Sequence, residues 1–201
     1  MELAERCGGF AADLERVGAG VPAAAVDAGD LTVATDRNPL AAVDRIADII
    51  RDGRRAEIRA VSPVVIQQFN RAAATALDAG AAVELVIDRD VVETSIADFA
   101  RATDRALDDD DATVYVSPEP IEYGLFRRDD VACVTAYDRR NNPRCVLEST
   151  DSAVVEWGDD RVESLAADAR RLAAGVGKAR RRGPGGRGPR GPPGGGRGGS
   201  A

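Results

Sequence analysis

Five polar residues stand where the sequence predicts strand ends, and their side chains could together hold a small ligand by hydrogen bonds and charge. Ser62 and Ser117 each occupy the middle of a Val-Ser-Pro triplet that follows a β-branched segment. Asp88 directly follows the apolar segment AVELVI, and Tyr123 and Arg127 come shortly after the second triplet. We take these five residues as the candidate ligand-binding site.

The surrounding elements predict that the two serines and the aspartate lie on one edge of a sheet. Extended segments at 57–61, 82–87 and 113–117 alternate with helical segments at 63–80 and 90–107, which gives a β-α-β-α-β order. Strands joined by crossover helices are usually parallel, so their carboxyl ends meet at the same edge. Open α/β sheets bind their ligands at that edge.

Each of these residues also has a purely structural interpretation. A serine before a proline at a helix start is a helix cap, and this interpretation of Ser62 stays open beside the ligand-binding one. Asp88 could only end a strand, and Ser117 could only mark a turn. Asp90 and Glu93 together predict a capping box for the second crossover helix.

Segments before the β-α-β-α-β unit extend the predicted domain. Residues 2–17 predict a short helix, and 25–38 leave room for a short strand. A second helix is predicted with Asn38 as its N-cap, Pro39 as its first residue and Gly53 as its stop.

After the third strand the apolar pattern keeps a period of about two, which predicts an antiparallel meander. Its strands are expected at 121–126, 131–137 and 144–149, separated by turn sequences. The fold class is therefore α/β, with a βαβαβ parallel core followed by an antiparallel β-meander and a C-terminal helix.

The C-terminal helix is expected to start after a cap at Thr150 or Asp151 and to run to about Ala174. Its apolar residues are the candidates for contact with the sheet. They are Val154, Val155, Trp157, Val162, Leu165 and Leu172.

Composition excludes several kinds of chemistry. The sequence has no histidine, which rules out a Ser-His-Asp triad, a Cys-His dyad and any imidazole metal ligand. Its cysteines, Cys7, Cys133 and Cys145, lack metal-ligand spacing, so we expect neither a metal nor a cofactor. Strand pairing about the turn at 138–143 places Cys133 and Cys145 on opposite faces. We therefore expect free thiols, which fit a reducing cytoplasm.

The charge is unevenly distributed along the chain. From Lys178 onward there are seven basic residues and no acidic one, so residues 1–177 hold the other 20 basic and all 34 acidic residues, a net charge of −14. Lys178 is the only lysine. An acidic, lysine-poor, alanine-rich body is typical of proteins from salt-loving archaea, where molar salt shortens the Debye length to about 3 Å.

The segment from Lys178 is predicted to be disordered, because it is rich in Gly and Pro and carries no apolar side chain larger than alanine or proline. Two interpretations stay open. Its arginines could follow a nucleic-acid phosphate backbone in a salt-dependent way. The segment could equally be an inert end produced by a shifted reading frame in GC-rich DNA.

Five segments carry a resemblance to a known family: LTVATDRNPLAAVDR, EIRAVSPVV, AAVELVIDRDVVE, VYVSPEPIEYGLFRRDDVACVTAYD and CVLESTDSAVVEWGDDRVESL. They span about residues 25–172, and the most distinctive part runs from the third predicted strand to Trp157. This region resembles the effector half of haloarchaeal winged-helix transcriptional regulators, a domain called the methanogenesis regulator middle domain.

The resemblance implies a domain that senses a small molecule or holds a dimer together, beside an N-terminal winged helix that reads DNA. Only residues 1–24 precede the matched segment, so we expect the DNA-binding half to be missing here, either through a gene start further upstream or because the domain stands alone. The predicted organisation is a connector (1–24), an effector-sensing and dimerisation domain (25–174) and a disordered tail (175–201).

The same region also resembles the phospholipase-D-like half of sugar-sensing archaeal regulators. Phospholipase-D enzymes need a histidine nucleophile and a lysine within their motif, and residues 1–177 contain neither. The resemblance therefore implies a non-catalytic domain.

The leading interpretation is the sensing and dimerisation domain of a transcriptional regulator, whose partners are a second copy, a small-molecule effector and, only through the missing half, DNA. One alternative is a ligand-free dimer module that uses the first and last helices as its contact. Another is nucleic-acid association through the tail. Because no apolar run could span a membrane and no secretory signal opens the chain, we expect it in the cytoplasm.

Overall fold

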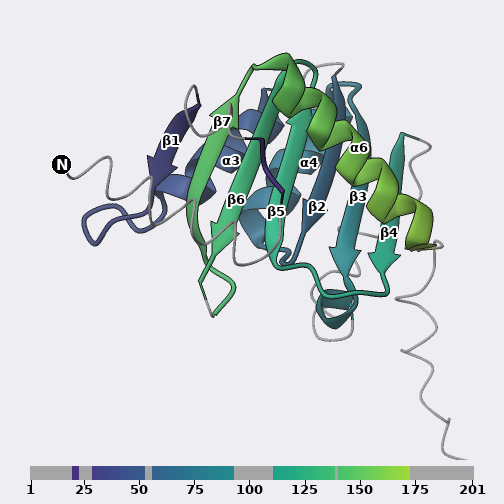
Figure 1. Ribbon diagram of the computed structural model, residues 1–201. Coiled ribbons are helices and arrows are strands. Elements are labelled where there is room, and N and C mark those ends of the chain that lie inside the picture. Colours follow the sequence, from purple (N-terminus) through teal and green to yellow (C-terminus); the bar gives the residue numbers. More distant parts are fainter. Residues whose placement is uncertain (1–19, 23–28, 53–55, 93–110, 139, 173–201) are drawn as a thin grey trace, which may run out of the picture.

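The computed structural model describes residues 20–22, 29–52, 56–92, 111–138 and 140–172 of the 201-residue chain. The described backbone contains one eight-stranded sheet with the order β1-β7-β6-β5-β2-β3-β4-β8 (Figure 1). Its strands are β1 (Asp30–Val33), β2 (Glu57–Ser62), β3 (Ala82–Asp88), β4 (Ala112–Ser117), β5 (Tyr123–Arg128), β6 (Val131–Tyr137), β7 (Pro143–Ser149) and β8 (Arg170–Arg171).

Helices α3 (Ala41–Arg51), α4 (Gln67–Asp78) and α6 (Ser152–Asp168) pack on this sheet. Figure 1 shows α6 crossing one face, while α3 and α4 lie on the other. Within the described residues, no helix combines the length and the apolar character needed to cross a membrane.

The parallel core is confirmed. β2 pairs in parallel with β3, and β3 pairs in parallel with β4. The register places Ser62 beside Ile87 and Asp88 beside Ser117, so the carboxyl ends of all three strands meet at one edge. We call this edge, together with residues 118–123 that follow β4, the carboxyl rim.

The antiparallel meander is confirmed as well. β5, β6, β7 and β1 pair in succession, and β5 joins the parallel block by pairing antiparallel with β2. The β5–β6 turn contains Asp129 at φ 50°, a left-handed conformation that aspartate tolerates better than most residues. β5 starts and ends two residues later than the sequence pattern predicts.

The core has one apolar layer on each face of the sheet. Alternate residues of β2 separate into the two layers: Ile58 and Ala60 pack toward α3 and α4, whereas Val61 packs toward α6. Cys133 lies in the first layer and Cys145 in the second. The expectation that these cysteines occupy opposite faces is therefore confirmed.

α6 begins where the sequence predicts, because the Asp151 carboxylate accepts a hydrogen bond from the Ala153 amide at 2.9 Å. Val154 and Val162 are fully buried against the sheet. The predicted end near Ala174 is wrong: the helix stops at Asp168, and the chain returns as β8 along β4. Leu172 is buried, but beyond the helix.

Three predicted helix starts are also wrong. α3 begins at Ala41, because Asn38 is engaged in a backbone bridge with Thr35. α4 begins at Gln67 rather than at Pro63. The helix after β3 already includes residues 89–92, so it begins before the predicted cap at Asp90. The predicted helix at 2–17, most of that at 90–107 and the tail lie outside the described residues.

Candidate functional site

Ser62 and Ser117 share the carboxyl rim but face opposite sides of the sheet. Ser62 alternates with Ala60 and therefore points toward α3 and α4. Ser117 alternates with Tyr115 and points toward α6, as does its register partner Asp88. The expected convergence of three polar groups is therefore wrong for Ser62, although the shared edge is correct.

Both serine hydroxyls are occupied by their own turns. The Ser62 hydroxyl donates to the Val64 carbonyl at 2.7 Å and accepts from the Val64 amide at 3.4 Å. The Ser117 hydroxyl does the same with Glu119, at 2.7 Å and 3.2 Å. The repeated Val-Ser-Pro triplet is thus a repeated turn. Ser62 does not cap α4, which begins five residues later.

Asp88 ties the rim together. Its Oδ1 accepts a hydrogen bond from the Asp90 amide at 2.8 Å, which caps the helical residues 89–92. Its Oδ2 accepts from the Ile121 amide at 2.9 Å. One carboxylate therefore holds both the helix start and the segment that leads into β5.

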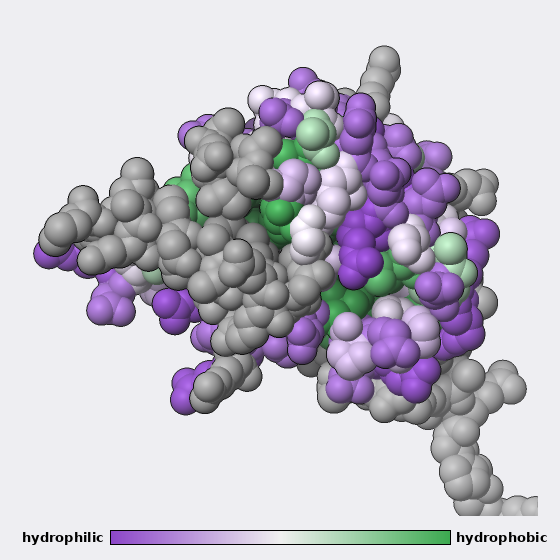
Figure 2. Space-filling view, in the orientation of Figure 1, coloured by the Kyte–Doolittle hydropathy of each residue, from purple (hydrophilic) through white to green (hydrophobic). Residues whose placement is uncertain are grey.

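A pocket of about 230 Å³ opens at the rim on the α6 side, and Tyr123 is the one predicted site residue that lines it. The segment before β5 provides one wall and α6 the other. The lining residues are Pro120, Ile121, Glu122, Tyr123, Arg161 and Leu165. Figure 2 shows this face as mainly hydrophilic, with hydrophobic residues reaching the surface beside α6.

Arg161 is the cation of this pocket, and sequence reasoning missed it. Its Nε donates to the Tyr123 hydroxyl at 2.6 Å, and its guanidinium carbon lies 6.0 Å from the centre of the Tyr123 ring. Within the described part of the chain no carboxylate pairs with Arg161. The contact with Tyr123 therefore orients the guanidinium, whose two terminal nitrogens have no partner among the described residues.

Arg127 does not reach the rim. It pairs in register with Arg59, toward the amino end of β2, because β5 runs antiparallel to β2. Its guanidinium binds Asp159 of α6 at 3.1 Å and approaches Glu57 at 3.9 Å. The prediction that Arg127 lies near Tyr123 at the edge is wrong.

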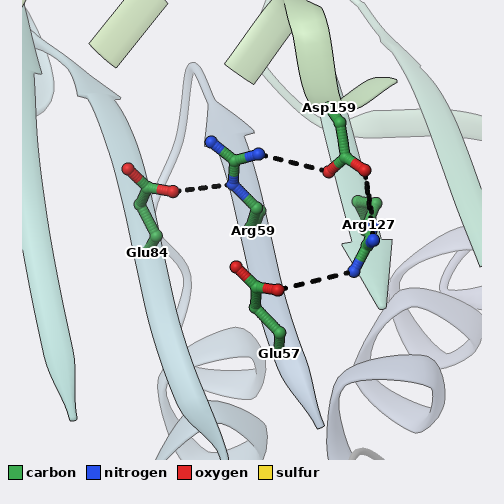
Figure 3. A network of polar contacts seen from close by, with 5 residues as sticks. All are labelled: Glu57, Arg59, Glu84, Arg127 and Asp159. Atoms are coloured by element: carbon green, nitrogen blue, oxygen red, sulfur yellow. Dashed lines mark hydrogen bonds and ion pairs between the residues drawn. The ribbon is translucent and has the colours of Figure 1, made fainter. Parts of the chain in front are cut away.

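Arg127 belongs instead to a five-residue ionic network between the sheet and α6 (Figure 3). Asp159 accepts from Arg127 with one oxygen and from Arg59 with the other, the latter at 3.3 Å. Arg59 also donates to Glu84 at 2.7 Å, and Glu57 completes the network through Arg127. The network fixes α6 over β2, β3 and β5.

The charges of this network outweigh the cost of burying Arg59. Burial of the guanidinium favours its neutral form, but the hydrogen bond and charge of Glu84 and the charge of Asp159 favour its charged form. The net result is a raised Arg59 pKa. Arg59 therefore stays ionised, and the network is a fixed structural feature of this face.

Two buried hydroxyl side chains lie near Gly124, on the face of the sheet that α3 and α4 cover. The Thr135 and Tyr137 hydroxyls are buried and have no hydrogen-bond partner among the described residues. Burial raises the pKa of Tyr137, and the nearby Ser62 hydroxyl lowers it in part. Ser62 makes no well-formed bond to Tyr137, because its hydroxyl is engaged with Val64. The Tyr137 side chain thus fills the space beside Ser62 on this face.

Comparison with solved structures defines the fold. The chain is similar to TrmBL2, an archaeal chromatin protein, with 12% sequence identity and a TM-score of 0.52, over 85% of this chain and 64% of that one. It is similar to Nuc, a phospholipase D family member from Salmonella typhimurium, with 11% identity and a TM-score of 0.55, over 73% of this chain and 98% of Nuc. It is also similar to NucT from Helicobacter pylori, with 10% identity and a TM-score of 0.57, over 72% of this chain and 98% of NucT.

These likenesses show the fold: a mixed α/β sheet that the chain shares with phospholipase D family members, as the sequence predicts. The chain spans less than two thirds of TrmBL2. No curated protein matches the chain in sequence.

Residues 39–168 match the family model of the methanogenesis regulatory protein FilR1, middle domain. The chain belongs to this family. It therefore contains the middle domain of an archaeal regulator, and the resemblance inferred from the sequence is confirmed.

Proposed function

We propose that the chain is the effector-sensing domain of an archaeal transcriptional regulator, and that the pocket at the carboxyl rim receives the effector. The observation that carries this proposal is the composition of the pocket walls. Ile121 and Glu122 belong to the segment before β5, whereas Arg161 and Leu165 belong to α6. A bound molecule would therefore contact the sheet edge and the helix at once.

The mechanism is a population shift in the position of α6. A ligand changes a conformational equilibrium only by as much as it binds one state better than the other. A ligand between the rim and α6 favours the state in which Arg161 and Leu165 face Ile121. Asp159 opposes any displacement of α6, because it is bound to two strands through Arg59 and Arg127.

The five residues singled out in the sequence take different parts in this proposal. Tyr123 contacts the ligand. Asp88 and Ser117 shape the rim segment that forms one pocket wall, and Ser62 shapes the neighbouring turn. Arg127 holds α6 in place and does not contact the ligand.

The same proposal includes a homodimer, a cytoplasmic location and the absence of catalysis. A regulator of transcription acts where DNA lies, and a change in dimer geometry would reset two DNA-reading heads. The absence of catalysis is supported by the regulatory family and by a sequence without histidine.

The test is a thermal-melting screen of metabolites with the full chain in molar salt, combined with light scattering. We expect at least one compound to raise the melting temperature in the wild type and to lose that effect in the double variant Tyr123→Phe, Arg161→Gln. Arg170→Gln removes the same charge outside the pocket and serves as the matched control. A rise that persists in the double variant would place sensing elsewhere.

Light scattering addresses the dimer separately. A dimer whose stability is independent of every compound would support the alternative of a ligand-free dimer module.

Nucleic-acid association through the tail is a distinct alternative. It is tested by deleting residues 178–201, and a gel shift that survives the deletion excludes it.

A further inference from the structure

We infer that the rim pocket selects small organic oxyanions, molecules that carry a carboxylate or phosphate group on a short apolar body. This inference rests on the proposed function and names the chemical class of the effector. It is carried by the orientation of Arg161 and by the walls of the pocket.

The guanidinium of Arg161 is held in a fixed orientation that suits the binding of an anion. The Tyr123 hydroxyl accepts the Nε hydrogen at 2.6 Å, so the planar guanidinium is held by its inner nitrogen. Its two terminal nitrogens have no partner among the described residues. Two parallel N–H donors in one plane match the oxygens of a carboxylate or a phosphate.

Among the described residues, the side-chain partner of Arg161 is a tyrosine and not a carboxylate. Arg45, Arg59 and Arg127 each bind a carboxylate in the described structure. Arg161 binds a tyrosine instead, so no described carboxylate neutralises its positive charge.

Glu122 lines the same pocket and does not cancel this charge. Its side chain is exposed, so its carboxylate stays hydrated, and it forms no ion pair with Arg161. Glu122 does add repulsion against an anion that approaches from the solvent side. The anionic group of the guest is therefore expected on the α6 side of the pocket, at Arg161.

The other walls set the size and polarity of the rest of the ligand. Ile121 is 8% exposed and Leu165 is half-buried, and together with Pro120 they form an apolar surface. The volume of about 230 Å³ lies below the roughly 300–1,000 Å³ that drug-sized ligands occupy. A guest of a few carbon atoms with one anionic group fits both features.

The experiment measures binding of matched probes to the full chain by calorimetry and thermal melting. Butyrate is compared with butyramide, and glycerol 3-phosphate with glycerol, so each pair differs mainly in charge. We expect the anion of at least one pair to bind at least tenfold more tightly than its neutral partner. The pair that responds distinguishes a carboxylate from a phosphate ligand.

Variants locate the binding. Arg161→Gln should reduce anion affinity at least tenfold, and Arg161→Lys should restore only part of it, because lysine keeps the charge but loses the planar fork. Arg170→Gln should leave affinity unchanged. Circular dichroism and the melting temperature without ligand show whether each variant folds.

Failure of this inference is distinguishable from failure of the proposed function. Leu165→Trp places a bulky side chain in the pocket. If neutral probes bind as well as anions, or Arg161→Gln binds anions normally, while Leu165→Trp abolishes binding, sensing stands and the oxyanion class is wrong. If no probe of either kind responds to Leu165→Trp, both are wrong.

Discussion

Gly124 of β5 lies directly beneath the side chain of Tyr137 of β6. A Cβ atom built on Gly124 would come within 2.7 Å of the Tyr137 hydroxyl oxygen and 3.2 Å of the Thr135 Cβ. Antiparallel pairing explains this, since Gly124 is opposite Thr135 and diagonal to Tyr137. The ring takes the place that a side chain at position 124 would need.

We therefore expect Gly124→Ala to destabilise the domain by about 1–3 kcal/mol, the usual cost of overpacking a well-filled core. The measurement is the free energy of unfolding from chemical denaturation in molar salt. When Tyr137 is already replaced by alanine, Gly124→Ala should cost less stability than it does in the wild type, because the clash is gone. Additive losses would contradict the contact.

For Gly158 of α6 we expect the opposite result, a gain in stability when alanine replaces it. A Cβ there would lie 3.6 Å from Leu125 Cδ1 and 3.7 Å from the Ala132 Cβ, which is ordinary van der Waals contact. Gly158→Ala should stabilise the domain by about 0.5–1 kcal/mol, because alanine loses less conformational freedom in a helix than glycine. A decrease in the denaturation midpoint would show that α6 packs more closely than described.

The Asp159 network should be worth more than an exposed ion pair. Asp159→Asn leaves Arg59 and Arg127, whose side chains are 16% and 17% exposed, without their shared partner. We expect a loss of about 2 kcal/mol, in the range for hydrogen bonds to charged groups. The matched control is Asp48→Asn, which breaks the exposed pair with Arg51 and should cost less than about 1 kcal/mol. Equal losses in the two variants would show that the network does not fix α6.

Alkaline pH should weaken the fold through Cys133. Burial, helped by the charge of Glu148, raises the pKa of this thiol from 9.0 to about 12. The unfolded thiol ionises from about pH 9 while the folded one stays neutral, so stability falls as pH rises, by up to about 1.4 kcal/mol per pH unit. Below pH 9 this contribution is fully present.

The measurement is the slope of unfolding free energy against pH between about 9 and 10. Cys133→Ala should flatten it, whatever the substitution costs at neutral pH. An unchanged slope would mean that the Cys133 thiol is not the group responsible.

Asp88 should control the order of the rim. Asp88→Ala removes the acceptor of the Ile121 amide, so that amide should exchange its hydrogen faster, and stability should fall by about 1–2 kcal/mol from the lost cap. Hydrogen exchange followed by NMR checks the first effect. Ser117→Ala affects the Glu119 turn instead and should leave the Ile121 amide protected by Asp88.

The strands were predictable because their signals are local. Apolar alternation marks β6 and β7, and the crossover rule orients β2, β3 and β4 without any knowledge of contacts. The shared edge of Ser62 and Ser117 follows from that rule. Their opposite faces do not, because a face depends on register, and a difference of one residue reverses it.

Arg161 and the Asp159 network could not be predicted because their signals are not local. On a helix with many acidic residues, Asp159 and Arg161 have the pattern of a solvated face. Their partners come together only when β5 pairs with β2, which places Arg127 beside Arg59. The alternation of Glu57 and Arg59 with the buried Ile58 was the available hint of a polar stripe on that face.

The two outermost strands of the described sheet limit how a second molecule can attach. β8 contains only two residues, Arg170 and Arg171, both exposed, and β1 at the other end contains four. Pairing of sheets across a subunit boundary needs a long, flat, uncharged edge strand, and short edge strands with exposed charges discourage it. Any contact between two copies of this domain is therefore expected to use helices or loops, with the β-ladder ending within each copy.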